Sequence, residues 1–227
     1  AAEQFKGAEM KLESLNFLDV VRHFESLPVA EIVRIYGAIG GVPAYLDKWD
    51  AAKSFKDNIC RLVLTPSGAL YGEADAVISS ELRELSAYST ILAAIARGEN
   101  KLNDIFHATG FSRAKISVYL KNLAAFNIVE KVVSFETGGW ENAKIKDTFV
   151  NFWFKFVYPN MSNLYLLSPE EFYDTYIEKE LDAYLERYFR EVCTEYLLIL
   201  NQMGQLPFTI KRVGTWIGKT GRIDIVA

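Results

Sequence analysis

The chain has 227 residues, half of them apolar and 14% aromatic, and carries a net charge of -4. This length allows one large domain or two to three small ones, and the composition argues against intrinsic disorder. The sequence contains no apolar run of the roughly 18 residues that a membrane helix needs, and the first ten residues show no signal pattern. We therefore expect a cytoplasmic protein without membrane contact.

Positive charge is concentrated in one segment. Residues 86–147 contain eight Lys and Arg against six Asp and Glu, a net charge of +2. Because polyanion affinity grows with the number of phosphates neutralised, this charge predicts weak nucleic-acid binding at best. Cys60 and Cys193 are far apart, and there are only two histidines, so the sequence does not predict a zinc site. We interpret both cysteines as core residues in a reducing compartment.

Helical patterns dominate the first third of the chain. Apolar residues at helical spacing predict helices over 13–39, interrupted at Pro28 and ended by Gly40-Gly41. Pro43 suits the first turn of the next helix, and a further helix is predicted through 55–63. The turn residues at 65–68 mark a boundary. We expect an all-helical segment over 1–65 and a linker over 66–80.

The middle of the chain predicts a winged helix-turn-helix over 81–160. Helices are expected at 88–96, 101–108 and 113–126, with Ser112 as the N-cap of the third. A Val- and Ile-rich strand at 128–135, a turn at Gly138-Gly139 and a returning strand at 144–149 would form the wing. Three helices followed by a hairpin are typical of this motif.

The last third mixes helix and strand. The aromatic run 149–156 is interpreted as a buried helix, 170–200 as mostly helical, and 208–212 and 222–227 as strands joined through 214–218. The fold class is thus mainly α with a small β component, and 161–227 forms a partial α/β segment. The chain stops within an apolar run, which predicts a truncated domain whose last strand lies at a sheet edge or pairs with another copy.

Three motifs together resemble a known family. They are Gly40–Leu46 (GGVPAYL), Phe152–Val157 with Pro159-Asn160, and Ile223–Ala227 (IDIVA). The chain resembles the C-terminal part of archaeal-type, AAA-like ATPases: the helical lid of the ATPase, a winged helix, and a restriction-endonuclease-like terminal domain of unknown function. The resemblance implies that Gly40, Gly41, Pro43 and Tyr45 belong to a signature near the nucleotide lid.

The departures from that family limit the expected chemistry. No G-x-x-x-x-G-K-[ST] phosphate loop occurs, so ATP and Mg²⁺ are implied for a longer parent protein and no cofactor is expected in this fragment. In the terminal domain the resemblance calls for a helix Glu, a strand Asp and an E-x-K. Asp224 matches the strand acid, but Arg190 stands at the position of the helix Glu, with Glu191 beside it. Directly before Ile223, where the family commonly has Glu, this chain has Arg222. The E-x-K segment is absent.

Glu191 and Asp224 are therefore metal candidates that would form half a site at most, and two solvated acids are the simpler interpretation. A remnant of a Mg²⁺-dependent nuclease is the least favoured function. The sequence identifies no catalytic residue.

Two further functions remain open. The basic residues of the third helix and the wing could contact DNA phosphates, with the acids Glu141 and Asp147 on the same face opposing them. Alternatively, the winged helix packs within its own chain or docks a protein partner, which the small net charge favours. The candidate nucleic-acid contacts are Arg113, Lys115, Lys121, Lys144 and Lys146.

Overall fold

The computed structural model describes residues 14–79, 84–133, 140–217 and 222–227. Within these ranges the protein is mainly helical, with two small antiparallel sheets of two strands each. The predicted fold class, mainly α with a small β component, is confirmed. None of the helices in the described ranges is long and apolar enough to cross a membrane.

The described part of the N-terminal third consists of helices and the loops between them. It contains α1 (Phe17–His23), α2 (Val29–Ile39), α3 (Pro43–Leu46), α4 (Phe55–Ile59) and α5 (Glu73–Ser79). A π-helical turn, η1 (Cys60–Leu64), continues α4. The side chains of Asn16 and Ser54 accept hydrogen bonds from the first turns of α1 and α4, and these caps define where the two helices begin.

Three helices and a hairpin follow, in the order predicted for a winged helix-turn-helix. They are α6 (Leu85–Arg97), α7 (Leu102–Thr109), α8 (Arg113–Ala125), β1 (Val129–Val133) and β2 (Trp140–Ile145), here called the winged-helix unit. The strands pair antiparallel, with Val129 opposite Ile145. The returning strand was predicted too late in the chain, at 144–149, because Asp147 caps the next helix instead. The predicted turn at Gly138-Gly139 lies outside the described residues.

A continuous helical stretch follows the hairpin. It comprises α9 (Thr148–Phe152), the π-helical η2 (Trp153–Val157) and the 3-10 turn η3 (Tyr158–Asn160). The aromatic run 149–156 is buried except for partly exposed Lys155, as predicted. Then come α10 (Met161–Leu164), α11 (Pro169–Tyr176) and the 25-residue α12 (Glu178–Gln202).

The final strands are β3 (Gly214–Ile217) and β4 (Arg222–Val226). The strand predicted at 208–212 is wrong, and β3 forms in the segment expected to link two strands. One cause is visible at Ile210. Its N–H donates to the Asn201 side chain at 2.7 Å, so a helix side chain takes the bond that a strand ladder would use.

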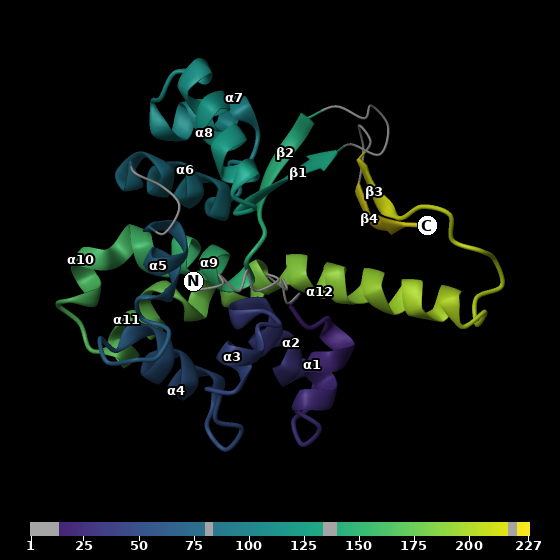
Figure 1. The fold of residues 1–227 in the computed structure, drawn as a ribbon. Coiled ribbons are helices and arrows are strands. Elements are labelled where there is room, and N and C mark those ends of the chain that lie inside the picture. The colour runs from purple at the N-terminus through teal and green to yellow at the C-terminus, as the bar shows by residue number, and fades with distance from the viewer. Residues whose placement is uncertain (1–13, 80–83, 134–139, 218–221) are drawn as a thin grey trace, which may run out of the picture.

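The long helix α12 organises the molecule. Figure 1 shows it crossing the structure, with α1 to α3 on one side and α6 to α8 with their hairpin on the other. A Cβ at Gly37 would lie 2.3 Å from Cδ2 of Leu185, so glycine permits the close approach of α2 to α12. One hydrophobic cluster extends from Phe17 to Tyr188 and therefore includes residues from all the predicted segments.

Candidate docking and nucleic-acid interface

The first helix of the winged-helix unit is buried on nearly all sides. Nine of the thirteen residues of α6 are buried, including Ile91, Leu92 and Ala94. The helix packs against α7 and β2 of its own unit and also against α9 and η2 of the following segment. A helix with a solvent face would show a polar stripe there, so this burial identifies α6 as one contact between the winged-helix unit and the rest of the chain.

The third helix begins as the sequence predicts. The Ser112 side chain accepts from the N–H of Lys115 at 3.3 Å, and the predicted apolar stripe is buried. Arg113 is exposed, but its Nε donates to Asn103 at 2.8 Å and its guanidinium lies 4.2 Å from the centre of the Phe106 ring. The stripe residues are Ile116, Tyr119, Leu120 and Leu123.

Lys115 is less available for contacts with phosphates than its position in the sequence predicts. It is only partly exposed, and its Nζ lies 4.3 Å from the centre of the Phe111 ring and 5.3 Å from that of Tyr119. Cation–π contacts of this kind stabilise the loop and helix locally. Arg113 and Lys115 therefore already have partners within the winged-helix unit.

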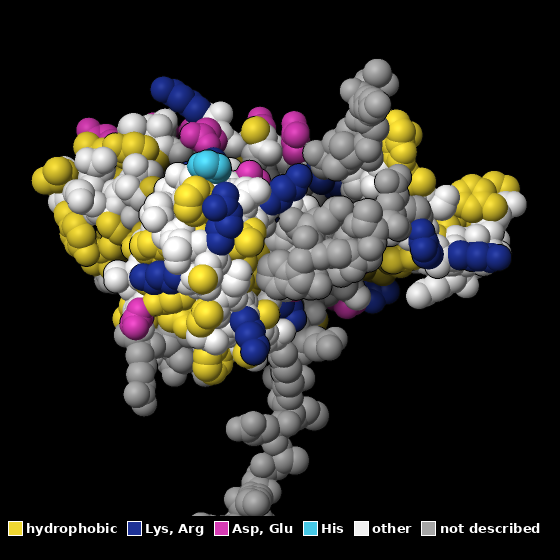
Figure 2. Space-filling view, turned by 90° about the horizontal axis from the view of Figure 1, so that it is seen from above, with side chains coloured by type: hydrophobic (Ala, Val, Ile, Leu, Met, Phe, Trp, Pro, Cys, Tyr) yellow, Lys and Arg dark blue, Asp and Glu magenta, His cyan; other side chains and the backbone are white. Residues whose placement is uncertain are grey.

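The remaining cations of this surface are dispersed. Lys121 is exposed on α8, and Lys146 is exposed beside Asn127, whose side chain accepts a hydrogen bond from its Nζ. Figure 2 views the molecule from above and shows basic side chains scattered over the face, with acidic ones among them, rather than one basic patch. Such a distribution focuses little positive potential on a phosphate backbone.

The side chain of Lys144 contacts α12. Its neighbours on β2, Ala143 and Ile145, are buried, so Lys144 lies on the opposite face of the hairpin. There its Nζ lies 2.6 Å from a carboxylate oxygen of Glu191 and 3.6 Å from one of Glu130. The hairpin is thereby bound to α12 through a charge-assisted hydrogen bond.

Asp147 was expected to oppose polyanion binding from the same face, and its placement corrects that expectation. Its carboxylate accepts from the N–H of Val150 at 2.9 Å and caps α9. Burial raises the pKa of this carboxyl, and hydrogen bonds from the α9 backbone act in the opposite direction. The side chain of Glu141 lies outside the described residues.

The GGVPAYL signature forms a joint between the helical segment and α9. The N–H of Leu15 donates to the carbonyl oxygen of Gly41 at 2.8 Å, and a Cβ on Gly41 would lie 1.9 Å from Leu15 O. Gly40 adopts φ of +69°, which favours glycine. Pro43 opens α3, and the buried Tyr45 ring meets Phe149 of α9 edge-on at 5.5 Å. Burial, with the charge of Asp147 next in size, raises the pKa of Tyr45.

The two metal candidates each contact a cation. Glu191 binds Lys144, and a carboxylate oxygen of Asp224 lies 3.2 Å from Nε of Arg190. Within the described ranges no group of three or more His, Cys, Asp or Glu could hold a metal ion. Adjacent residues of α12 thus hold the two hairpins, Glu191 the β1–β2 hairpin and Arg190 the β3–β4 hairpin.

Two polar contacts that position α12 were not predicted from the sequence. The side chain of Asn151 is fully buried, and its Nδ2 donates to the hydroxyls of Tyr184 at 2.9 Å and Tyr188 at 3.1 Å. The carboxylate of Glu195 accepts from the backbone N–H groups of Phe17 and Leu18 at 3.1 and 3.2 Å. The polar Asn151 within an aromatic run was a signal for the first contact. Nothing local in the sequence signals the second.

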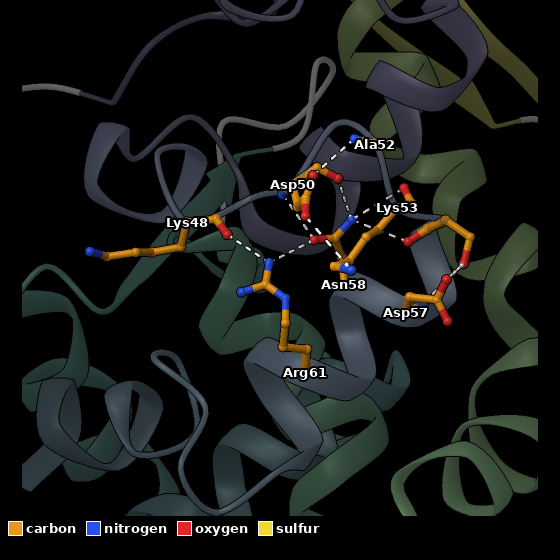
Figure 3. Close-up of polar contacts among 8 residues, drawn as sticks. Lys48, Asp50, Ala52, Lys53, Asp57, Asn58 and Arg61 are labelled. Carbon is orange, nitrogen blue, oxygen red and sulfur yellow. Dashed lines mark hydrogen bonds and ion pairs between the residues drawn. The ribbon is translucent and has the colours of Figure 1, made fainter.

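A further buried polar residue organises the loop before α4. Figure 3 shows Asn58 at the centre of the loop residues 48–54. Its Oδ1 accepts from the N–H of Asp50 at 3.0 Å and from Arg61 at 2.9 Å. Its Nδ2 donates to the carbonyl oxygen of Asp50 at 2.9 Å and to that of Ser54 at 3.1 Å. Arg61 also donates to the carbonyl oxygen of Lys48, so two side chains satisfy loop backbone groups in addition to the loop's own backbone hydrogen bonds.

Part of the chain matches a family of known proteins. Residues 153–227 match a family described as archaea bacterial proteins of unknown function, DUF234. The chain is similar to the uncharacterized protein MJECL04 of Methanocaldococcus jannaschii, with 31% identity over 230 residues that cover 98% of this chain and 50% of that protein. The chain thus spans about half the length of this curated relative. No solved structure matches. The DUF234 match is compatible with the terminal domain of unknown function in the family that the sequence resembles.

Proposed function

We propose that this chain is a non-catalytic portion of a longer ATP-binding, AAA-like protein, and that its winged-helix unit serves as an intramolecular docking module. The unit would hold the helical segment before it and the DUF234-matching segment after it in a defined arrangement. ATP and Mg²⁺ belong in this proposal to the parent protein. The resemblance of the GGVPAYL and Phe152–Val157 motifs supports the ATPase part of the proposal.

The burial of α6 carries the docking part. Ile91, Leu92 and Ala94 are each fully buried, and α6 packs against η2 and α9 as well as against its own unit. The apolar surface removed from water at this contact favours association by roughly 25 cal/mol per Å². Lys144 adds the charged contact to α12. A winged helix held on α9, η2 and α12 of its own chain is suited to transmit a change of position rather than to bind a ligand alone.

Hydrogen exchange tests the docking. If α6 and η2 form one packed unit, their slowest amides open in the same event, and their opening free energies agree within roughly 1 kcal/mol. Amides of α7, which buries only Ile105, serve as the internal comparison and should exchange faster. The measurement is native-state exchange of the whole chain, resolved by NMR. The docking proposal fails if α6 opens several kcal/mol more easily than Trp153–Val157, because the winged-helix unit would then move as an independent body.

A second candidate, weak nucleic-acid binding, is favoured by the outer face of α8. Arg113, Ser117 and Lys121 recur at four-residue spacing and are all exposed, as on a recognition helix. If this face binds DNA, changing Lys121 to Ala should lower the log–log salt slope of affinity by about 0.9. Fluorescence anisotropy with a short labelled duplex across a salt series measures it. Lys179→Ala, on α12, is the matched control. Binding that is absent at low salt, or equal slopes for both variants, would leave docking alone.

A further inference from the structure

Two carboxylates one helical turn apart on α12 contact two different elements. Glu191 binds Lys144 of β2 at 2.6 Å. Glu195 accepts hydrogen bonds from the backbone N–H groups of Phe17 and Leu18, at the start of α1. Residues i and i+4 of a helix share a face, so one face of α12 contacts both the winged-helix unit and the N-terminal helices.

These polar contacts occur where α12 lacks a buried apolar anchor. Its buried residues, Leu181, Tyr184, Leu185 and Tyr188, all lie in the first half of the helix. From Phe189 to Gln202 the residues are exposed or partly exposed, although many are apolar. The position of this second half therefore depends strongly on its charged contacts, since little apolar surface is removed from water there.

Tyr36 of α2 reports that both carboxylates belong to one cluster. Burial, followed by the charges of Glu195 and Glu191, raises the pKa of this phenol to about 12. The Tyr36 ring also meets Phe17 of α1 edge-on at 5.5 Å. The charges of Glu195, which holds α1, and of Glu191, which holds the hairpin, thus both act on the same residue of α2.

We propose that Glu191 and Glu195 form a clasp that couples the winged-helix unit to α1. The helix between them is rigid over one turn, so a displacement of Glu191 with the hairpin moves Glu195 away from the N–H groups of α1. The inference rests on the proposed docking of the winged-helix unit and adds a route of regulation to it. Because α1 lies in the segment that resembles the nucleotide lid, the clasp would transmit lid position to the winged-helix unit.

Amide exchange at Phe17 and Leu18 tests the clasp, because the acceptor of both N–H groups is Glu195. Lys144→Met keeps the apolar stem of the side chain and removes the charge. We expect it to accelerate exchange of both amides at least about 2-fold, the lower end of couplings within one network. Lys155→Met is the matched control. Its Nζ forms an ion pair of the same length, 2.6 Å, with Glu180 of the same helix, far from Glu195 in sequence.

The reverse arm uses Glu195→Ala and follows the N–H of Ala143, which donates to the carbonyl oxygen of Asn100 at 2.9 Å. Coupling is reciprocal, so this amide should also exchange faster. Glu191→Gln, which retains the side-chain shape, repeats the first arm should Lys144→Met fold poorly. Unchanged Phe17 and Leu18 amides in Lys144→Met and Glu191→Gln, or an equal effect of Lys155→Met, would overturn the clasp. The opening free energies of α6 and η2 are measured separately, so the docking proposal can stand while the clasp fails.

Discussion

Gly41 shows how a single residue joins two segments. Its carbonyl oxygen accepts from Leu15, and the chain passes so close that a Cβ would meet Leu15 O at 1.9 Å. We predict that Gly41→Ala lowers the free energy of unfolding by about 1–3 kcal/mol, as overpacking does. Gly72→Ala is the control, because a Cβ there meets nothing within 4 Å. It should be neutral or stabilise by about 0.4–1 kcal/mol. Urea unfolding of both variants measures the difference, and equal stabilities would contradict the close approach.

The two cysteines differ in their surroundings. Cys60 is 4% exposed, and burial, with a nearby carboxylate next in size, raises its thiol pKa from an ordinary 9.0 to about 12. Cys193 is only partly buried, so the prediction that both are core residues holds for Cys60 alone. At pH 8 we expect a thiol reagent to label Cys193 in the native protein and Cys60 only in urea. Native labelling of a Cys193→Ser variant would contradict this.

The raised thiol pKa also makes the free energy of unfolding depend on pH. Between about pH 9 and 12 the unfolded state loses the Cys60 proton while the native state keeps it. This contribution to stability is therefore fully present below pH 9 and is lost as the pH rises to about 12. Cys60→Ala should flatten the alkaline part of a stability profile measured by urea unfolding. A profile of unchanged slope would show that the thiol does not titrate differently in the two states.

At the scale of elements, the loop before α4 depends on one buried amide. Asn58 is 0% exposed and makes hydrogen bonds to the backbone of Asp50 and Ser54 and to Arg61. Asn58→Ala should lower the free energy of unfolding by about 2–3 kcal/mol, because buried loop groups lose their partners. Lys48→Ala is the control. That side chain is exposed and only its carbonyl is used, so the change should stay within about 0.5 kcal/mol. Similar losses in both variants would contradict the role of Asn58.

At the scale of the whole molecule, we predict that this chain does not bind ATP tightly. The sequence contains no phosphate loop, and without its lysine and amide cradle most phosphate stabilisation is missing. Calorimetric titration with ATP and Mg²⁺ should yield no dissociation constant in the low micromolar range. The segment that resembles the ATPase lid can contact a nucleotide, but a lid supplies few contacts to the phosphates. Micromolar binding would show that residues outside the recognised motif form a nucleotide site.

The spacing of apolar residues and the capping residues predicted most elements, because interactions between residues close along the chain form these elements. The stripe Ile116–Leu123 and the Ser112 cap produced α8, and the β-branched run produced β1. The wing's second strand and the strand at 208–212 were misplaced because their ends depend on other elements. Asp147 is used as a helix cap, and Ile210 is bound by Asn201 of α12. The sequence predicted which charged residues belong to the candidate site, but it did not predict which side chains they contact.

The sequence by itself determined the fold class, the order of three helices and a hairpin, and the absence of a phosphate-loop motif, because each depends on periodicity or on residues close along the chain. Only the tertiary structure decided what the charged residues contact. Lys144 meets Glu191 across 47 positions, and Phe17 meets Glu195 across 178. Such pairs form when apolar packing brings α1, α12 and the hairpin together, and no local spacing encodes them. The basic residues that looked like a nucleic-acid surface thus include one that binds the protein's own long helix.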